Sequence, residues 1–471
     1  MHGDRFNRRN ASALRHARAV LALLFGPPSM RGFTVRLWDG SSDGGDGTER
    51  AGSPCVITLK RPGALRRMLL PPSELRLGEA YLRDDFDIEG DIEVAAALTD
   101  SVAHRLSSPA IVSRLVPHLI ALPADDIAAA GSLSSSLATP AGGGNARPVT
   151  RQRGERQDAP AVRFHYDAGN DFFALWLDRG LVYSCGYFPT GSESIDDAQT
   201  AKLEYLCRKL RLQPGDRLLD IGCGWGGLAL YAAAHYGADA TGITLSEPQA
   251  ALARVRIAAA GLQNCCRVQV CHYRELPTDA HYDKVISVGM VEHVAAAQLP
   301  DYFATAARLT RPGGLFLNHG IVYPGQPIYT GRVARVVRRL WGDGAFVERY
   351  VFPGGRLATA GEIVRLGESA GFEVRDVENL REHYTLTLRR WVRRLEGAHA
   401  EAARLVGEPS YRVWRLYMAA SARAFALGRL GLLQVLFSLP DAGGRSGLPL
   451  TRAGLYEQHP DHHGDDDRTL V

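Results

Sequence analysis

The sequence predicts an α/β fold in which a doubly wound, Rossmann-like parallel sheet follows a small α+β N-terminal domain. Three observations support this prediction. Strand-like and helix-like segments alternate between residues 217 and 321. A glycine-rich turn at residues 222–227 follows the first of these strands. The chain of 471 residues is also longer than one ordinary domain.

Composition and charge restrict the class of protein. Hydrophobic residues make up 45% of the chain, which suits a globular protein with a substantial core. The net charge of +4 is modest, but the first 36 residues carry seven arginines and one acid. Such a basic arm can contact an anionic partner, although it is more often simply solvated. The seven cysteines follow no disulfide or zinc spacing, so we expect a cytoplasmic protein with reduced thiols.

The N-terminal third predicts a small domain followed by a linker. Alternating apolar and polar residues at 33–38 and 56–59 predict two strands, and residues 100–130 are helical in pattern. Residues rich in Gly, Ser, Ala and Pro then predict a flexible linker. We expect a basic arm, the small domain, the linker, the α/β domain and a tail in this order: residues 1–30, 31–130, 131–160, 161–440 and 441–471.

The α/β domain shows a regular succession of elements after an amphipathic helix over residues 196–210. The expected order is strand 217–221, helix 227–236, strand 239–245, helix 247–260, strand 267–271, strand 282–288, helix 298–310 and strand 314–321. Residues 331–341 predict a helix with a basic face, which either lies on an anionic membrane or is simply solvated. Two further helices are expected over residues 384–407 and 409–436.

The glycine-rich turn predicts a site for a nucleotide-like cofactor, because it leaves backbone N–H groups free at the edge of the sheet. Its G-x-G-x-x-G spacing comes from Gly222, Gly224 and Gly227. A dinucleotide site also needs an acid at the end of the second strand. That position carries Thr244, Leu245 and Ser246 instead. Asp220, just before the turn, is where S-adenosylmethionine (SAM) methyltransferases have an acid, so the pattern favours SAM over a nicotinamide cofactor.

Candidate catalytic residues lie at the carboxyl ends of two later strands, where such sheets place their sites. Gly289, Glu292 and His293 follow strand 282–288, and His319 lies in the fifth strand. Glu and His there can act as a base or hold one, or they can cap the next helix. The histidines have no metal-binding spacing and no evident fourth ligand, so we predict no metal site.

Motifs in a fixed order along the chain resemble the cyclopropane-fatty-acyl-phospholipid synthases, a family of SAM-dependent enzymes that includes the mycolic acid cyclopropane synthases. The resemblance covers Val162 to about Leu436 and, more weakly, Phe33–Leu98. It is carried by His165-Tyr166-Asp167, Asn170-Asp171-Phe172, Tyr183-Ser184-Cys185, Ala198-Gln199, Lys202-Leu203, residues 219–226, residues 242–246 with Gln249, Gly289-Met290, Glu292-His293, residues 352–355, Tyr411-Arg412 and Trp414.

The resemblance implies a class I SAM-dependent methyltransferase fold and a set of SAM-binding residues, in which Gln249 faces the ribose and Tyr273 the adenine. The set is Tyr183, Ser184, Asp220, Gly222, Gly224, Gly226, Thr244, Leu245, Gln249 and Tyr273. It also implies a bicarbonate ion beside the methyl group. The positions that match its ligands are Cys185, Glu292, His319, Ile321 (backbone) and Tyr384, with Gly289 and His293 in the same loop as Glu292.

The implied reaction is methyl transfer to an unactivated double bond, which leaves a carbocation on the other carbon. A base then removes a proton from the new methyl group so that a cyclopropane ring closes, and a buried anion can also stabilise the cation. The small domain contains Gly78-Glu79-Ala80-Tyr81, which resembles phospholipid-acting members, so an unsaturated phospholipid acyl chain is the expected substrate. His272 and Val291 depart from the family pattern, on the adenine side and in the acyl wall.

Several alternatives stay open at this point. Relatives of this scaffold make methyl-branched or methylene-branched fatty acids, and others methylate amines. A non-catalytic lipid-binding protein and a dehydrogenase fit the residues less well, given Asp220, Glu292 and His319 and the missing ribose acid. The resemblance further implies peripheral contact with the inner face of the membrane. We expect no nucleic-acid partner, and a homodimer is left open.

Overall fold

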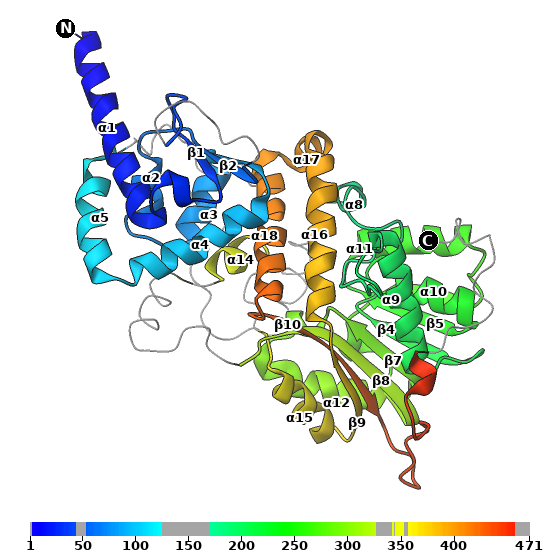
Figure 1. Ribbon diagram of the computed structural model, residues 1–471. Helices are drawn as coiled ribbons and strands as arrows, with labels where there is room; N and C mark the ends of the chain where they lie inside the picture. The colour runs from blue at the N-terminus through cyan, green and yellow to red at the C-terminus, as the bar shows by residue number, and fades with distance from the viewer. Residues whose placement is uncertain are drawn as a thin grey trace. The chain divides into compact units, whose positions relative to one another are not determined.

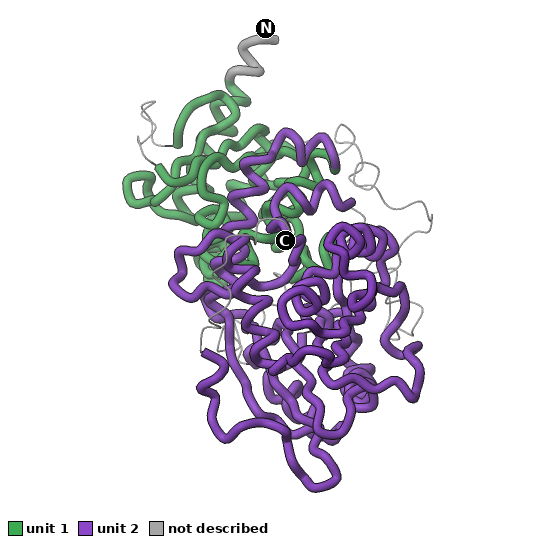
Figure 2. Tube along the Cα trace, turned by 90° about the vertical axis from the view of Figure 1, so that its right-hand side faces the viewer, with its two compact units in different colours: residues 1–145, 327–353, 406–423 green, residues 146–326, 354–405, 424–471 purple. Residues whose placement is uncertain are grey.

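The computed structural model describes residues 2–43, 53–124, 169–325, 342, 344–352 and 357–456. The chain divides into two compact units, each assembled from separate stretches (Figure 2). Unit 1 consists of residues 1–145, 327–353 and 406–423, and unit 2 of residues 146–326, 354–405 and 424–471. The units therefore differ from the contiguous ranges expected, because two segments between residues 161 and 440 belong to unit 1.

Unit 1 contains a three-stranded sheet of β1 (Thr34–Arg36), β2 (Cys55–Leu59) and β3 (Phe86–Gly90), in that order. β1 pairs parallel to β2, and β3 pairs antiparallel to it. The first two strands confirm the predicted alternating segments. The helices of the unit are α1 (His2–Phe25), α2 (Ala64–Leu69), α3 (Glu74–Leu82), α4 (Ile92–Leu106), α5 (Pro109–Ala121), α14 (Ala345–Tyr350) and most of α18 (Glu408–Ala426).

The N-terminal segment differs from the loose arm or short helix expected for residues 1–30. It forms the 24-residue helix α1, which packs against α4 and α5 (Figure 1). The reason is an apolar stripe at helical spacing that reaches the core of the unit. Its buried members are Ala13, Ala17, Val20, Leu21 and Leu24.

Unit 2 is built on a seven-stranded sheet in the order β6-β5-β4-β7-β8-β10-β9. The strands are β4 (Arg217–Ile221), β5 (Asp239–Thr244), β6 (Cys266–Val270), β7 (Tyr282–Val288), β8 (Thr310–Val322), β9 (Glu373–Asn379) and β10 (Gly431–Ser438). β10 runs antiparallel to both of its neighbours, β8 and β9, and the remaining pairs of strands in this sheet are parallel. The predicted doubly wound fold is confirmed, and its switch point between β4 and β7 creates a crevice at the carboxyl ends of the strands.

Helices cover both faces of this sheet (Figure 1). On one face α9 (Ile195–Leu210), α10 (Gly227–Tyr236) and α11 (Glu247–Ala259) share a core with the strands, and on the other α12 (Leu299–Leu309) and α15 (Ala360–Ser369) share a second core. Consecutive strand residues point to opposite faces, so Leu218 belongs to the first core and Leu219 to the second. The short helix α8 (Asn170–Ala174) precedes them in the chain.

The C-terminal prediction of two helices is wrong for its last part. The structure has α16 (Arg381–Gly397), α17 (His399–Val406) and α18, and then strand β10 over residues that were predicted as helical. Every residue of β10 is buried because the strand lies between β8 and β9. A strand covered on both faces is continuously apolar, so its sequence lacks the alternation that identifies half-buried strands.

Some predictions fall outside the described residues. These are the linker at 131–160, the motif His165-Tyr166-Asp167, the basic helix at 331–341, most of the 352–355 motif and much of the C-terminal tail. Within the described parts of the chain, no helix is long and apolar enough to cross a membrane.

Candidate active site

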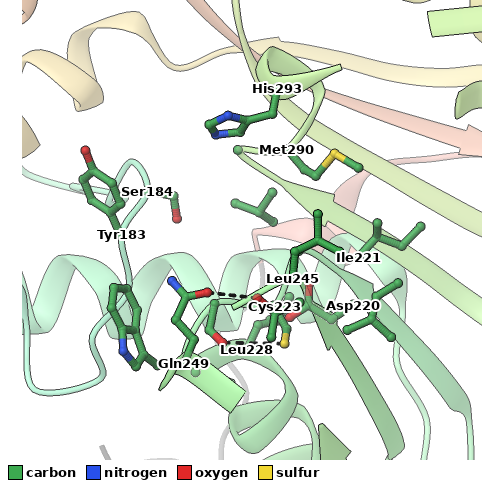
Figure 3. A pocket seen from close by; sticks show the side chains of 18 of the residues that line it. Tyr183, Ser184, Asp220, Ile221, Cys223, Leu228, Leu245, Gln249, Met290 and His293 are labelled. Carbon is green, nitrogen blue, oxygen red and sulfur yellow. Dashed lines mark hydrogen bonds between the residues drawn. The ribbon is translucent and has the colours of Figure 1, made fainter. Parts of the chain in front are cut away.

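A cavity of about 150 Å³ opens at the carboxyl ends of β4, β5 and β7 (Figure 3). Its walls include nine of the ten residues predicted for SAM, namely Tyr183, Ser184, Asp220, Gly222, Gly224, Thr244, Leu245, Gln249 and Tyr273. The tenth, Gly226, is not part of the wall, whereas its neighbour Gly227 is. Gly289 and His293 also line the cavity, so the loop after β7 faces the same space.

The turn after β4 owes its shape to glycine. Gly222 and Gly226 have φ angles of +84° and +78°, a region that side chains disfavour. The N–H groups of Gly222 and Cys223 both donate to the Ile243 carbonyl at 2.9 Å, which fixes the turn against β5. A Cβ on Gly226 would lie 3.2 Å from Ala253 of α11, so this glycine allows close helix packing.

The end of β5 orients Gln249. The Thr244 hydroxyl donates to Gln249 Oε1 at 2.9 Å, and the Ser246 N–H donates back to the same hydroxyl oxygen. This network occupies the amide oxygen of Gln249. Among the described residues, no acceptor is recorded for the amide N–H groups of Gln249, which lines the cavity. The side chain is therefore available to donate to a hydroxyl-rich group such as a ribose.

The wall that carries Tyr183 and Ser184 is held from behind. Gln199 of α9 donates to the carbonyls of Val182 and Ser184 at 3.1 and 2.8 Å. The Tyr183 ring packs among Phe173, Trp176 and Trp391, with centroid distances of 5.4–5.6 Å. One face of this segment therefore belongs to the core, while its edge forms part of the cavity wall.

Two buried charges of opposite sign line the cavity. Asp220 is 3% exposed, and burial raises its pKa to about 7 although the positive charge of Lys202 opposes this shift. Lys202 of α9 is 2% exposed, and burial lowers its pKa to about 8 against the attraction of Asp178. The Lys202 ammonium donates to the Ser184 hydroxyl at 3.0 Å. The sequence contained a signal for Lys202, a lysine on the buried face of an amphipathic helix, but no role was assigned to it.

A second polar group centres on Glu292 and His319. Glu292 Oε1 accepts from the backbone N–H of Ile321 at 2.7 Å, while Oε2 is buried with no hydrogen-bond partner among the described residues. His319 Nδ1 lies 3.2 Å from the amide nitrogen of Gln434, and its Nε2 is likewise buried and unpartnered. The Ile321 backbone, predicted to face an ion, positions Glu292 through this bond, and its contact with an ion stays a prediction.

Burial dominates the protonation of this group. It raises the pKa of Glu292 to about 7 and lowers the pKa of His319 to about 3, with the positive charges of Lys202 and Lys209 adding to the second shift. The pKa of His293 falls to about 4 for the same reason. At neutral pH both imidazoles are therefore uncharged, and Glu292 is balanced between its two forms.

The loop after β7 joins this group to the cavity. Gly289 lines the cavity, and its N–H donates to the His319 carbonyl at 2.8 Å. Figure 3 shows His293 and Met290 on the opposite side of the cavity from Gln249. A Cβ on Gly320 would collide with Val291. Val291, which departs from the family pattern, therefore packs directly against the strand that carries His319.

Cys185 and Tyr384 reach the same region through Leu380. The Cys185 sulfur lies 4.0 Å from the Leu380 carbonyl, and the Tyr384 N–H donates to that carbonyl at 3.2 Å. Leu380 in turn donates to Leu432, which pairs with Ile321 across β10 and β8. Burial raises the pKa of the Cys185 thiol well above its ordinary value, so the thiol stays protonated.

All five positions predicted for bicarbonate lie in one region of unit 2, but none of them lines the cavity. Sequence reasoning missed Gln434, the partner of His319, because its segment was predicted to be helical.

On the adenine side, His272 Nδ1 accepts from the Arg274 N–H at 3.2 Å and its ring lies 4.3 Å from Tyr273. His272, which departs from the family pattern, therefore caps the turn in which it lies. No group of three potential metal ligands occurs in the described stretches.

Comparison with known proteins agrees with this geometry. The family model described as mycolic acid cyclopropane synthetase matches residues 153–435. The chain belongs to this family. A second model, a domain of unknown function (DUF7884), matches residues 23–105.

Individual relatives extend the assignment. The probable fatty acid methyltransferase of Pseudomonas putida is 39% identical over 91% of this chain and 98% of its own length. The cyclopropane-fatty-acyl-phospholipid synthase of Escherichia coli K12 is 36% identical over 61% of this chain and 69% of its own. The structure of mycolic acid cyclopropane synthase CmaA1 with SAH and CTAB matches with a TM-score of 0.54 and 31% identity, over 59% of this chain and 97% of that one. The predicted resemblance and the class I SAM-dependent methyltransferase fold are both confirmed.

Proposed function

We propose that this member of the mycolic acid cyclopropane synthetase family transfers the methyl carbon of SAM to the double bond of an unsaturated fatty acyl chain in a phospholipid, and that a cyclopropane ring then closes. Family membership and the names of the relatives support methyl or methylene transfer to a lipid. The phospholipid substrate and the ring are the finer parts of this proposal, and each has its own support and test below.

SAM is the proposed methyl donor because a related enzyme was solved with SAH, the product that SAM leaves after transfer. The cavity at the ends of β4, β5 and β7 suits it. Gln249 presents amide N–H groups for a ribose, Tyr273 supplies an aromatic wall for the adenine, and Asp220 offers a carboxylate to the methionine ammonium. These residues would bind and orient the cofactor, which supplies an electrophilic methyl group when bound.

The observation that carries ring closure is the pair of unpartnered atoms, Glu292 Oε2 and His319 Nε2. Burying a polar atom without a hydrogen bond costs about 1–3 kcal/mol, so two such atoms in one region indicate a missing partner. With Gln434 donating to Nδ1, the proton of the neutral His319 ring lies on Nε2 and can be donated. Protonated Glu292 is a second donor.

Two buried donors suit a small anion such as bicarbonate, which would supply the base that takes a proton from the methylated cation. Glu292 and His319 would hold this ion, and Ile321 and Gln434 would hold Glu292 and His319 in turn. Burial of the whole group excludes water, which would otherwise add to the cation.

The second candidate is fatty acid methylation without ring closure. The Pseudomonas putida relative, which matches 91% of this chain, is named a probable fatty acid methyltransferase. The two reactions share methyl transfer and differ in the fate of the cation. In a branched product that stays unsaturated the cation loses a proton from a different carbon, whereas a saturated methyl branch would also need a separate hydride donor.

The deciding experiment supplies the purified protein with unsaturated phospholipid vesicles and SAM carrying a deuterated methyl group. Mass spectrometry of the lipids detects transfer, and proton NMR of unlabelled product separates a ring from a branch. High-field ring protons are the expected result. A methyl or methylene branch would replace ring closure by the second candidate, and an unmodified lipid would overturn lipid methylation altogether.

We also propose that the protein contacts the inner face of the membrane, since its substrate would lie in the bilayer. The exposed arginines Arg8, Arg9 and Arg15 of α1 support an electrostatic contact with anionic headgroups. Sedimentation with anionic vesicles should exceed sedimentation with zwitterionic vesicles, and alanine at these three positions should reduce the difference. Equal sedimentation with both vesicle types would contradict this contact.

A further inference from the structure

Helix α9 contains two lysines that are almost completely buried. Lys202 is 2% exposed and Lys209 is 1% exposed. A buried ammonium group costs several kcal/mol unless an anion balances it, and lysine is rarely found inside a protein without such a partner. The surroundings of the two lysines can therefore be compared directly.

Lys209 has its partners within the protein. Its ammonium lies 3.1 Å from Asp376 and also contacts Glu378, both on β9. Lys202 has no such pair. Among the described residues it makes one hydrogen bond, to the neutral hydroxyl of Ser184, and no carboxylate lies within 4.0 Å of its nitrogen. An ammonium has three N–H donors, so Lys202 keeps donors for a further group.

The acids near Lys202 do not change this conclusion. Asp178 accepts from the N–H groups of Gly180 and Val182 at 2.8 Å each, and it affects Lys202 as a charge without forming an ion pair with it. The Asp220 carboxylate makes no hydrogen bond or ion pair within the described residues, and Lys202 affects it only as a charge at longer range. Lys202 and Asp220 both line the cavity. The cavity thus offers one buried cation and one buried anion that do not satisfy each other.

A pair of separated opposite charges complements a zwitterion, and the amino-acid end of SAM is one. The nucleoside end has its own expected contacts at Gln249 of α11, the helix after β5, and at Tyr273, in the turn after β6. We propose that the Lys202 ammonium, together with the Ser184 hydroxyl, binds the carboxylate of the methionine portion of SAM. This inference rests on the proposed use of SAM. A charge-assisted hydrogen bond in a buried site would also explain why an unpaired lysine is retained there.

The test measures binding of two ligands by calorimetry, SAM and decarboxylated SAM, which lacks only the carboxylate. The wild-type protein is expected to prefer SAM by about 10-fold to 100-fold, the range for a hydrogen bond between charged groups. In Lys202→Met and Lys202→Gln this preference should fall close to unity. The matched control is Lys209→Met, which removes an equally buried lysine of the same helix and should keep the preference even where it lowers stability.

The outcomes are separable. Equal affinity of the wild-type protein for the two ligands overturns the inference whether or not any variant folds. A preference that persists in a Lys202 variant whose thermal unfolding is cooperative also overturns it, and assigns the lysine a structural role. If the wild-type protein binds neither ligand, the proposed use of SAM fails together with this inference.

Discussion

At the scale of single residues, Glu292 combines burial with a carboxyl oxygen that has no hydrogen-bond partner among the described residues. Glu292→Gln keeps the size of the side chain and removes its acid. We expect the variant to bind SAM normally and to lose turnover by about 100-fold, within the usual range for a group that positions or acts as a general base. Binding by calorimetry and turnover with labelled SAM measure the two effects.

The matched control is Glu401→Gln, which changes an exposed carboxylate on α17 and should leave both quantities unaltered. Unchanged turnover in Glu292→Gln would remove Glu292 from the reaction.

Gln434 is expected to act through His319, since it contacts the ring nitrogen opposite the unpartnered one. Gln434→Leu keeps the strand buried but removes the donor that fixes the tautomer of the ring. Turnover should fall by about 10-fold or more with SAM binding unchanged, as for other residues that orient a catalytic group. The ¹⁵N shifts of His319 should show a changed tautomer. A loss of turnover with unaltered shifts would indicate a packing defect instead.

Asp220 makes the folded protein sensitive to pH. Burial raises its pKa from 3.8 to about 7, so between these values the folded state holds a proton that the unfolded chain releases. Stability is therefore lost as the pH rises through this window, by at most about 4 kcal/mol. Asp220→Asn should raise the free energy of unfolding of the ligand-free protein by about 1–3 kcal/mol near pH 8.

Urea titration measures this gain, which should shrink as the pH is lowered toward about 4. A gain that is independent of pH, or a loss of stability near pH 8, would contradict the assignment of a destabilising carboxylate.

Residue identities in the cavity were largely predictable because a strand, a glycine turn and a helix follow one another locally, and β-strand ends share one edge. Gln434 and the unpaired state of Lys202 were not. The role of Gln434 depends on the pairing of β10 with β8, and the unpaired state of Lys202 depends on the lack of a carboxylate near its nitrogen among the described residues. Both are set by segments distant in the sequence, so the local sequence does not reveal them.

At the scale of elements, Gly78 allows α3 and α14 to approach closely. A Cβ at this position would overlap the ring of Phe346, while Tyr350 of the same helix donates to Glu79 at 3.2 Å. Gly78→Ala should therefore destabilise unit 1 by about 1–3 kcal/mol, the usual cost of overpacking. Thermal and chemical unfolding measure it, and Phe346→Leu in the same chain should restore part of the loss.

Gly361→Ala in α15 provides the control, because nothing lies within 4 Å of its added Cβ and alanine favours a helix. Equal effects at the two glycines would show that close approach is not the cause at Gly78.

Elements with a clear period were predicted well, as β4, β7 and α10 show by their matching bounds. Elements without one were not. β10 shows no alternation because both of its faces are covered and all of its residues are buried, the polar Gln434 and Ser438 included. α1 has an apolar stripe that gains a partner only when α4 and α5 are present to pack against it.

At the scale of the whole molecule, α18 supplies unit 1 with part of its core. Arg415 donates to the Tyr81 hydroxyl at 2.9 Å and to the Ile88 carbonyl at 3.1 Å, and Val413 and Tyr417 are buried beside it. Removing residues 2–124 would expose these side chains. We expect the shortened chain to self-associate, as measured by size-exclusion chromatography with light scattering.

Serine at positions 413 and 417 of the shortened chain should reduce self-association. A shortened chain that is monodisperse without these changes would show that α18 does not depend on the N-terminal stretch.

Domain content was predictable from composition, but the division of the chain was not. A boundary read along the sequence is a single cut, whereas unit 1 collects three stretches that are separated by parts of unit 2. This arrangement bears on inheritance. A recombination event with one junction cannot transfer either unit intact, because α18 and Tyr81 would then come from different parents. Chimeras between this chain and its relatives therefore require exchanges at several junctions, with α18 and the N-terminal stretch taken from the same parent.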